Sequence, residues 1–131
     1  METGIRNRIE ETVTEELTAK AMGSGELPVF ATPAMAALIE ETCWKSVAAG
    51  LDDGQGTVGT KLDVAHVSAT PVGMRVACES ELIEMDGRKL TFKVKVYDEQ
   101  SLIGEGTHER FIVDNDRFLQ KAKSKIRPPE Y

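Results

Sequence analysis

The sequence lacks the features that mark membrane, secreted and metal-binding proteins. No apolar run approaches the ~20 residues of a membrane-spanning helix, and the N-terminus lacks the apolar core of a secretion signal. Only two cysteines, Cys43 and Cys78, and two histidines, His66 and His108, are present, without a CxxC pair. They are too few for a closed zinc site unless carboxylates contribute. We therefore expect a cytoplasmic protein with buried, reduced thiols and no metal centre.

Positive charge is also scarce. The 131 residues include 16 Lys and Arg against 22 Asp and Glu, a net charge of −6. That sign opposes a phosphate backbone, and the basic residues between Lys121 and Arg127 suit a solvated helix end. We expect neither nucleic acid nor a membrane as a partner. The length fits a single domain over residues 1–131, with a flexible tail from about residue 124.

A helix signal dominates the first half of the chain. The preceding segment Ile9–Lys20 is expected to form a strand, and Met22–Pro28 a loop. Thr32 can serve as an N-cap with Pro33 at the first helical position, so a helix is predicted over Pro33–Ala49. Its apolar stripe consists of Met35, Leu38, Ile39, Thr42, Cys43, Ser46 and Val47.

Strand signals fill the rest of the chain. The expected features are strands over Val58–His66, Arg75–Met85, Leu90–Val96 and Leu102–Val113, a bulge near Leu82, and a hairpin turn at Asp86-Gly87. A short helix capped by Asp114 or Asn115 should end before Pro128. One helix against about five antiparallel strands, the last four in a meander, predicts an α+β fold.

Three polar residues around the helix are candidates for chemistry, and each has a simpler explanation. Glu40 borders the apolar stripe, where burying a carboxylate is costly, but it also suits the wet edge of the helix. His66 continues the inward parity of Val58 and Leu62, as a core histidine or a general base would. Thr32 stands where free N–H groups favour an oxyanion, although capping alone accounts for it.

The last strand adds a fourth candidate. His108 and Arg110 share one face, and Arg110 offers a planar fork for phosphate or carboxylate. A solvent-facing strand with charge pairs is the simpler interpretation. Gly104 and Gly106 in the same strand indicate a bulge or the close approach of another backbone or a ligand.

Five separate segments, considered together, point to a known family. They are Val29–Pro33, Leu38–Glu40, Gly56–Thr60, Val64–Gly73 and Gly106–Arg110. Their combination, with the closing Thr-His-Glu-Arg motif, resembles the fluoroacetyl-CoA thioesterase family of hot-dog-fold thioesterases, from about Ile9 to Lys121. The resemblance implies a hot-dog fold, in which a curved antiparallel sheet of about five strands wraps around one long helix.

The same resemblance implies an activity and a site. It implies an acyl-CoA thioesterase that hydrolyses a short or unspecified acyl-CoA to the free acid and CoA, with CoA present only as part of the substrate. The family's catalytic residues fall on Thr32, Glu40 and His66. Residues expected to bind the acyl-CoA are Gly59, Arg110 and Phe30. Such proteins are typically homodimers whose sheets join edge to edge, with the site at the interface.

Helix geometry restricts how these residues can cooperate. Eight residues separate Thr32 from Glu40, about 12 Å along one regular helix, so water, substrate, a partner subunit or a fold in the chain must bridge them. The loop Met22–Leu27 has no aromatic residue to enclose a fluorinated group, so the acyl group stays unspecified. Two alternatives remain open: a non-catalytic domain that binds an acyl-thioester or similar ligand, and a dehydratase acting on a 3-hydroxyacyl thioester through His66 and Glu40.

Overall fold

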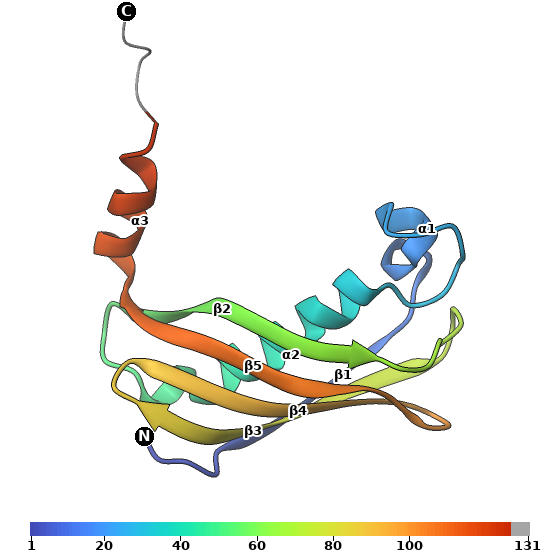
Figure 1. Cartoon of the computed structure of the whole chain (residues 1–131), viewed down its shortest axis with the longest axis horizontal. Coiled ribbons are helices and arrows are strands. Elements are labelled where there is room, and N and C mark those ends of the chain that lie inside the picture. The colour runs from blue at the N-terminus through green and yellow to red at the C-terminus, as the bar shows by residue number, and fades with distance from the viewer. Residues whose placement is uncertain (127–131) are drawn as a thin grey trace, which may run out of the picture.

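The computed structural model describes residues 1–126, in which a curved five-stranded antiparallel sheet wraps around one long helix (Figure 1). The strands are β1 (Arg6–Thr12), β2 (Gln55–His66), β3 (Arg75–Asp86), β4 (Lys89–Asp98) and β5 (Leu102–Asp114). The helices are η1 (Glu15–Leu17), α1 (Ala19–Met22), α2 (Thr32–Val47), η2 (Ala48–Gly50) and α3 (Asn115–Lys123). The predicted α+β architecture of one long helix and five strands is confirmed.

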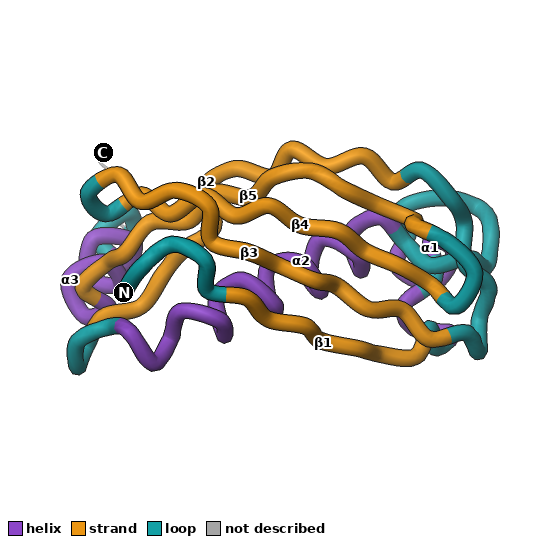
Figure 2. Tube along the Cα trace, turned by 90° about the horizontal axis from the view of Figure 1, so that it is seen from below, coloured by secondary structure: helices purple, strands orange, loops and turns teal. Residues whose placement is uncertain are grey.

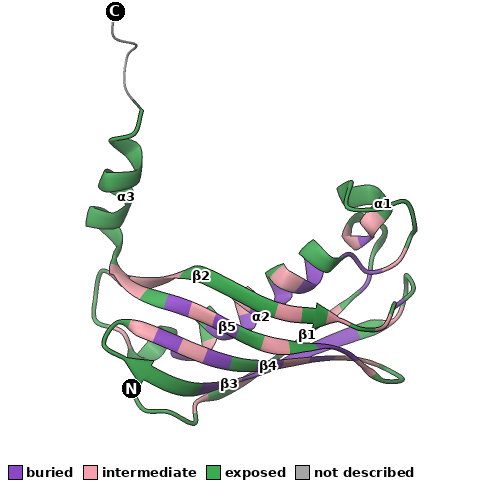
Figure 3. Ribbon diagram, in the orientation of Figure 1, coloured by how far each residue is buried: buried purple, intermediate pink, exposed green. Residues whose placement is uncertain are grey.

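The long helix supplies one side of the core. Figure 2 shows α2 lying along one face of the sheet. The predicted stripe is buried apart from Ser46, which is half-buried, and the alternating residues Leu90, Phe92, Val94 and Val96 of β4 are buried opposite it (Figure 3). Removing this apolar surface from water is the main stabilising contribution to the fold. Cys43 and Cys78 are free and buried, and burial raises the pKa of both thiols.

The order of strands differs from the predicted meander. The sheet runs β1-β3-β4-β5-β2, so β2 pairs with β5 and not with β3. Residues 67–74 connect β2 to β3 across the end of the sheet. The two strands lie three strand spacings apart, about 14 Å, and eight residues span up to ~26 Å. Because this connection is long enough to cross β4 and β5, alternation alone could not reveal the neighbours of β2.

The N-terminal strand is shorter than predicted. It ends at Thr12, and the rest of Ile9–Lys20 forms the turn η1 and the start of α1. The Thr18 hydroxyl accepts a hydrogen bond from the backbone N–H of Ala21 and so caps α1. Gly23, at φ +75°, ends this helix. The strand prediction beyond Thr12 is therefore wrong, because local capping favours a helical turn there.

Bulges in β2 and β3 and the C-terminal helix complete the fold. The predicted bulge in β3 is present as a register shift between Leu82 and Glu84, and a second shift lies between Gly59 and Lys61 of β2. The C-terminal helix α3 starts after Asp114, as expected, and projects away from the sheet (Figure 1). It ends at Lys123, so the expected end before Pro128 is confirmed, whereas most of the tail predicted from about residue 124 lies outside the described residues. Within residues 1–126, no helix is long and apolar enough to cross a membrane.

Candidate active site

Thr32 and His66 meet at the N-terminal end of α2. Thr32 is the first residue of the helix and Ala31 is its N-cap, so the prediction that the Thr32 hydroxyl caps the helix is wrong. Instead, Thr32 Oγ1 lies 2.8 Å from Nδ1 of His66, the last residue of β2. A residue inside the helix has no need to cap it, which leaves this hydroxyl available to the imidazole. The contact joins residues 34 positions apart in the chain.

The surroundings of His66 favour its neutral form. Burial lowers the pKa of the imidazole, and a backbone group of Ser68 opposes this only partly. The Phe30 ring packs edge-on, with centroids 6.3 Å apart. Nε2 is buried and makes no hydrogen bond with the residues that the structure describes. A neutral imidazole can accept a proton at Nδ1, so the pair has the geometry of a hydroxyl and its general base.

A hollow of about 310 Å³ opens beside this pair. Its lining consists of Ala19, Ser24, Val29, Phe30, Thr32, His66, Val67, Ser68 and Ala69. The loop that follows His66 is anchored because the Thr70 hydroxyl donates to Asp98 Oδ2 at 2.8 Å and the Thr70 carbonyl accepts from the Phe30 N–H at 2.8 Å. The hollow is lined by apolar side chains together with the hydroxyls of Ser24 and Ser68 and the Thr32–His66 pair.

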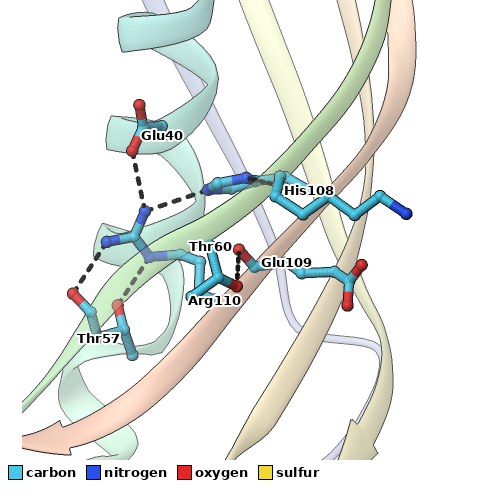
Figure 4. A network of polar contacts seen from close by, with 7 residues as sticks. Glu40, Thr57, Thr60, His108, Glu109 and Arg110 are labelled. Atoms are coloured by element: carbon cyan, nitrogen blue, oxygen red, sulfur yellow. Dashed lines mark hydrogen bonds and ion pairs between the residues drawn. The ribbon is translucent and has the colours of Figure 1, made fainter.

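Glu40 belongs to a second group of side chains, two turns further along α2 (Figure 4). Arg110 Nη1 lies 3.5 Å from Glu40 Oε2 and 3.1 Å from His108 Nε2. Arg110 also donates through Nε to Thr57 Oγ1 at 2.8 Å and through Nη2 to the Thr57 carbonyl at 2.9 Å. Burial lowers the pKa of the Arg110 guanidinium, although the nearby Glu40 carboxylate opposes this effect.

Gly59 lies against this second group because of the bulge in β2. A Cβ atom at Gly59 would lie 2.7 Å from Glu40 Oε2 and 3.1 Å from Arg110 Nη1. The bulge also places Val58 on the outer face opposite Phe111, whereas Leu62 pairs with His108 on the helix side. The prediction that His66 shares a face of the strand with Leu62 is therefore correct, whereas the prediction that Val58 lies on the same face is wrong.

The close approach predicted at Gly106 is confirmed. A Cβ atom there would lie 2.0 Å from the Asp63 carbonyl oxygen, so only glycine allows β2 and β5 to pair closely at this point. This pairing carries β2 past the bulge to the position where it ends at His66. The glycine thus helps to place the imidazole beside α2.

Within one chain, the predicted site residues form two groups. Thr32, His66 and Phe30 lie together at the start of α2, whereas Glu40, Gly59 and Arg110 lie together further along it. Sequence reasoning gave Thr57 no role, although it lies in the Gly56–Thr60 segment of the resemblance, and singled out His108 only for its position beside Arg110. A larger hollow of about 620 Å³, lined by charged residues such as Arg8 and Lys93, contains none of the predicted residues.

Comparison with known proteins gives consistent matches. The family of fluoroacetyl-CoA-specific thioesterases (FlK) matches residues 13–116. A fluoroacetyl-CoA thioesterase from Streptantibioticus cattleyicolor is 39% identical over 97 residues, which is 74% of this chain and 70% of that protein. An FlK variant solved with fluoroacetate superposes with a TM-score of 0.91 at 33% identity, over 97% of this chain and 100% of that chain.

A more distant structure agrees in fold alone. A hot-dog-like protein from Thermanaerovibrio acidaminovorans has a TM-score of 0.88 at 18% identity, covering 97% of this chain and 94% of that one. The predicted hot-dog fold is thereby confirmed, together with the resemblance on which it was based.

Proposed function

Because the chain belongs to the family of fluoroacetyl-CoA-specific thioesterases, we propose that Thr32, His66 and Glu40 hydrolyse the thioester bond of a short-chain acyl-CoA. The predicted enzyme class, a thioester hydrolase, is confirmed by the family and by the 39% identical relative. The observation that carries the residue assignment is the 2.8 Å contact between the Thr32 hydroxyl and His66 Nδ1 beside the hollow.

The pair supplies a nucleophile and its base. His66 Nδ1 accepts the hydroxyl proton as Thr32 Oγ1 attacks the thioester carbonyl carbon. The carbon–sulfur bond then breaks, and the imidazolium returns the proton to the CoA thiolate. Water hydrolyses the acyl-threonine to the free acid and restores the hydroxyl. In an alternative mechanism, Thr32 orients the attacking water and is not itself acylated. Mass spectrometry of the enzyme mixed with substrate separates the two mechanisms, since only nucleophilic attack by Thr32 adds the mass of the acyl group to the protein.

Backbone groups are placed to stabilise the developing oxyanion. Thr32 begins α2, so the backbone N–H groups of Thr32 and Ala34 and the positive end of the helix dipole lie at this end of the helix, while Pro33 has no N–H and the Met35 N–H donates to the Ala31 carbonyl. Hydrogen-bond donors at such a position stabilise a tetrahedral intermediate more than the ground-state carbonyl. This arrangement supports acyl transfer over a purely binding role for the hollow.

The proposal includes a homodimer that joins the two groups of residues. β2 is an edge strand, and its stretch 59–63 is exposed along one side of the sheet. Antiparallel pairing of two copies about Lys61 would set His66 of one copy opposite Gly56 of the other, within about 10 Å of its Gly59. A two-fold axis perpendicular to the sheet keeps both helices on the same face. The partner subunit's Glu40 then lies near Thr32 and can activate the hydrolytic water.

Mixed dimers test this arrangement directly. Thr32→Ala and Glu40→Gln chains are each inactive in the proposal, but a dimer with one of each keeps one intact site. A 1:1 random mixture should therefore recover about a quarter of the wild-type turnover if the sites are shared between subunits. A mixture that stays as inactive as its parents contradicts the shared site. Light scattering that reports a monomer would also contradict it.

The activity itself is tested by thiol release from a panel of acyl-CoAs that includes acetyl-, fluoroacetyl-, propionyl- and octanoyl-CoA. Short chains should be hydrolysed in preference to octanoyl-CoA, because the hollow beside Thr32 is small. Binding without thiol release, or an enoyl product from a 3-hydroxyacyl-CoA, would contradict the proposal. A cytoplasmic location forms part of it, and the two free cysteines support a reducing compartment.

A further inference from the structure

Arg110 is a buried charge with an unusually complete set of partners. Its side chain is 6% exposed, whereas that of Glu40 is 47% exposed. Four of its five N–H groups point to Thr57 Oγ1, the Thr57 carbonyl, His108 Nε2 and Glu40 Oε2 (Figure 4). At most one N–H remains for a bound substrate. The guanidinium is therefore built into the protein and presents its charge to the carboxylate.

The hydrogen bonds of His108 determine its tautomer. Nδ1 lies 2.8 Å from the carbonyl oxygen of Lys61, which can only accept, so Nδ1 carries the proton. Nε2 lies 3.1 Å from Arg110 Nη1, which can only donate, so Nε2 must be unprotonated. The side chain is 2% exposed, and burial together with the Arg110 charge lowers the pKa of this imidazole. His108 is thus a neutral acceptor between a carbonyl and a guanidinium.

We propose that His108 is a positioning residue: as a neutral Nδ1–H imidazole, it holds the Arg110 guanidinium where that group orients the Glu40 carboxylate. The inference rests on the proposed function, because Glu40 must take part in hydrolysis for its orientation to affect turnover. Protonated His108 has no lone pair for Arg110 and repels it, so the guanidinium loses its place. Turnover then requires two neutral imidazoles, His66 for proton transfer and His108 for position.

The groups around His108 support this role. The charged partners that face it are Arg110 on its own strand and Glu40 on α2. The Lys61 carbonyl comes from β2, and the Phe92 ring of β4 lies at a centroid distance of 6.4 Å. The neighbouring Glu109 carboxylate pairs with Lys89 at 3.2 Å. The carboxylates of Glu40 and Glu109 favour the imidazolium, but burial and the Arg110 charge outweigh them, so protonation of His108 is unfavourable in this setting.

Paired substitutions of His108 test the proposal. Glutamine places a carbonyl acceptor near the position of Nε2 and does not titrate, whereas leucine fills the space without an acceptor. His108→Leu should lower kcat about 10- to 100-fold, the range expected for losing a hydrogen bond to a charged group, with little change in KM. His108→Gln should restore most of that loss. Equal kcat in the leucine variant and the wild type would overturn the proposal.

The pH dependence of kcat distinguishes this positioning role from a purely structural one. For the wild type, the acid limb of log kcat against pH should approach a slope of about 2, since two imidazoles must be neutral. In His108→Gln the slope should fall to about 1. An unchanged slope of 2 in the glutamine variant overturns the proposal. Circular dichroism over the same pH range checks that each variant stays folded.

Thr57 offers a second pair if His108→Leu does not fold. Thr57→Val removes the oxygen that accepts from Arg110 Nε, and Thr57→Ser keeps it. The valine variant should lose kcat and the serine variant should regain it; equal activities in the two would count against the positioning of Arg110.

Nitrogen NMR of the intact protein separates this inference from the proposed function. His108 should show a protonated Nδ1 and an unprotonated Nε2 whether or not the chain hydrolyses any acyl-CoA. The opposite tautomer overturns the positioning role, while the expected tautomer in a protein without thiol release leaves the positioning intact and overturns the proposed activity.

Discussion

The two groups of site residues on α2 differ in how firmly they are held. At the start of the helix, Thr32 is exposed and His66 half-buried, and one hydrogen bond joins them beside a hollow. Further along, Arg110 is buried and has partners for four of its N–H groups. The first group is neutral and accessible, as a reacting hydroxyl and base must be. The second contains a buried charge, which is stable only when its hydrogen bonds are satisfied.

Accessibility and rigidity are thus divided between the start and the middle of α2. Bond making needs atoms that a substrate can reach, whereas orienting a carboxylate needs atoms that do not move. Substitutions at the start of α2 should therefore act on turnover while the fold stays intact. Substitutions around Arg110 should act through the position of Glu40.

The largest effect is expected at Thr32. Thr32→Ala should lower kcat on the order of 10²-fold or more, because the hydroxyl that attacks or orients water is lost. Thr32→Ser keeps the hydroxyl and should retain much of the activity. Thiol release at saturating acyl-CoA measures both, with thermal denaturation as the control for folding. Full turnover in the alanine variant would show that the hydroxyl takes no part in the reaction.

A smaller loss is expected at Gly59. In Gly59→Ala the added methyl would lie 2.7 Å from Glu40 Oε2, so the carboxylate must shift. A displacement of about 1 Å in a catalytic group lowers the rate about 10- to 100-fold. Gly50→Ala is the matched control, since its methyl meets only the flexible Met1 side chain. Steady-state kinetics that give equal rates for both variants would place Glu40 outside the reaction.

Asp98 binds the loop that follows His66 and lines the hollow, so its substitution should lower the stability of the fold. Hydrogen bonds from the Gln100 and Ser101 backbone and the Thr70 hydroxyl outweigh desolvation and hold the pKa of the Asp98 carboxyl below its usual value. Asp98→Asn should lower the free energy of unfolding by about 1 kcal/mol at pH 7.

The pH dependence of this difference follows from its sign. Because the folded pKa is depressed, the wild-type advantage is present above the unfolded pKa and disappears as pH falls through the folded one. Urea denaturation at pH 7 and pH 3 measures this, with the exposed Asp53→Asn as control. A difference that does not shrink at all between pH 7 and pH 3 would assign the effect to packing.

The smallest effect is the histidine contribution to stability. The pKa values of His66 and His108 are both lowered, so the unfolded chain binds more protons than the folded chain below its imidazole pKa, about 6.5. The free energy of unfolding should therefore decrease from pH 7.5 to pH 5.5, and less steeply in His108→Gln. Urea denaturation at the two pH values measures the change. An identical decrease in both proteins would show that His108 does not contribute to the pH dependence of the free energy of unfolding.

Sequence reasoning predicted those parts of the fold that depend on neighbouring residues. The helix at Thr32–Val47 was predicted within two residues at its C-terminal end because its apolar spacing and the proline near its start are local signals. The alternation in β4 likewise identified its buried face. The strand predicted through Lys20 failed because capping by Thr18 and the termination at Gly23 favour a helical turn.

The position of β2 could not be predicted in the same way. Its neighbour is β5 because residues 67–74 cross the end of the sheet, and alternation carries no information about which strand pairs with which. The bulge after Gly59 then moves Val58 to the outer face and brings Gly59 against Glu40. Arg110 was a candidate from the Thr-His-Glu-Arg motif, but its contact with Thr57 depends on this register.

By itself, the sequence determined the single long helix, the strands after it and the family resemblance, since periodicity, turns and motifs act over a few residues. Only the tertiary structure decided that the Thr32 hydroxyl contacts His66 and does not cap the helix, and that Arg110 holds a place between Glu40 and His108. The physical reason is distance along the chain: the first contact spans 34 residues and the Arg110–Glu40 pair spans 70. Such contacts form only when strand order and register are set by packing against the common core.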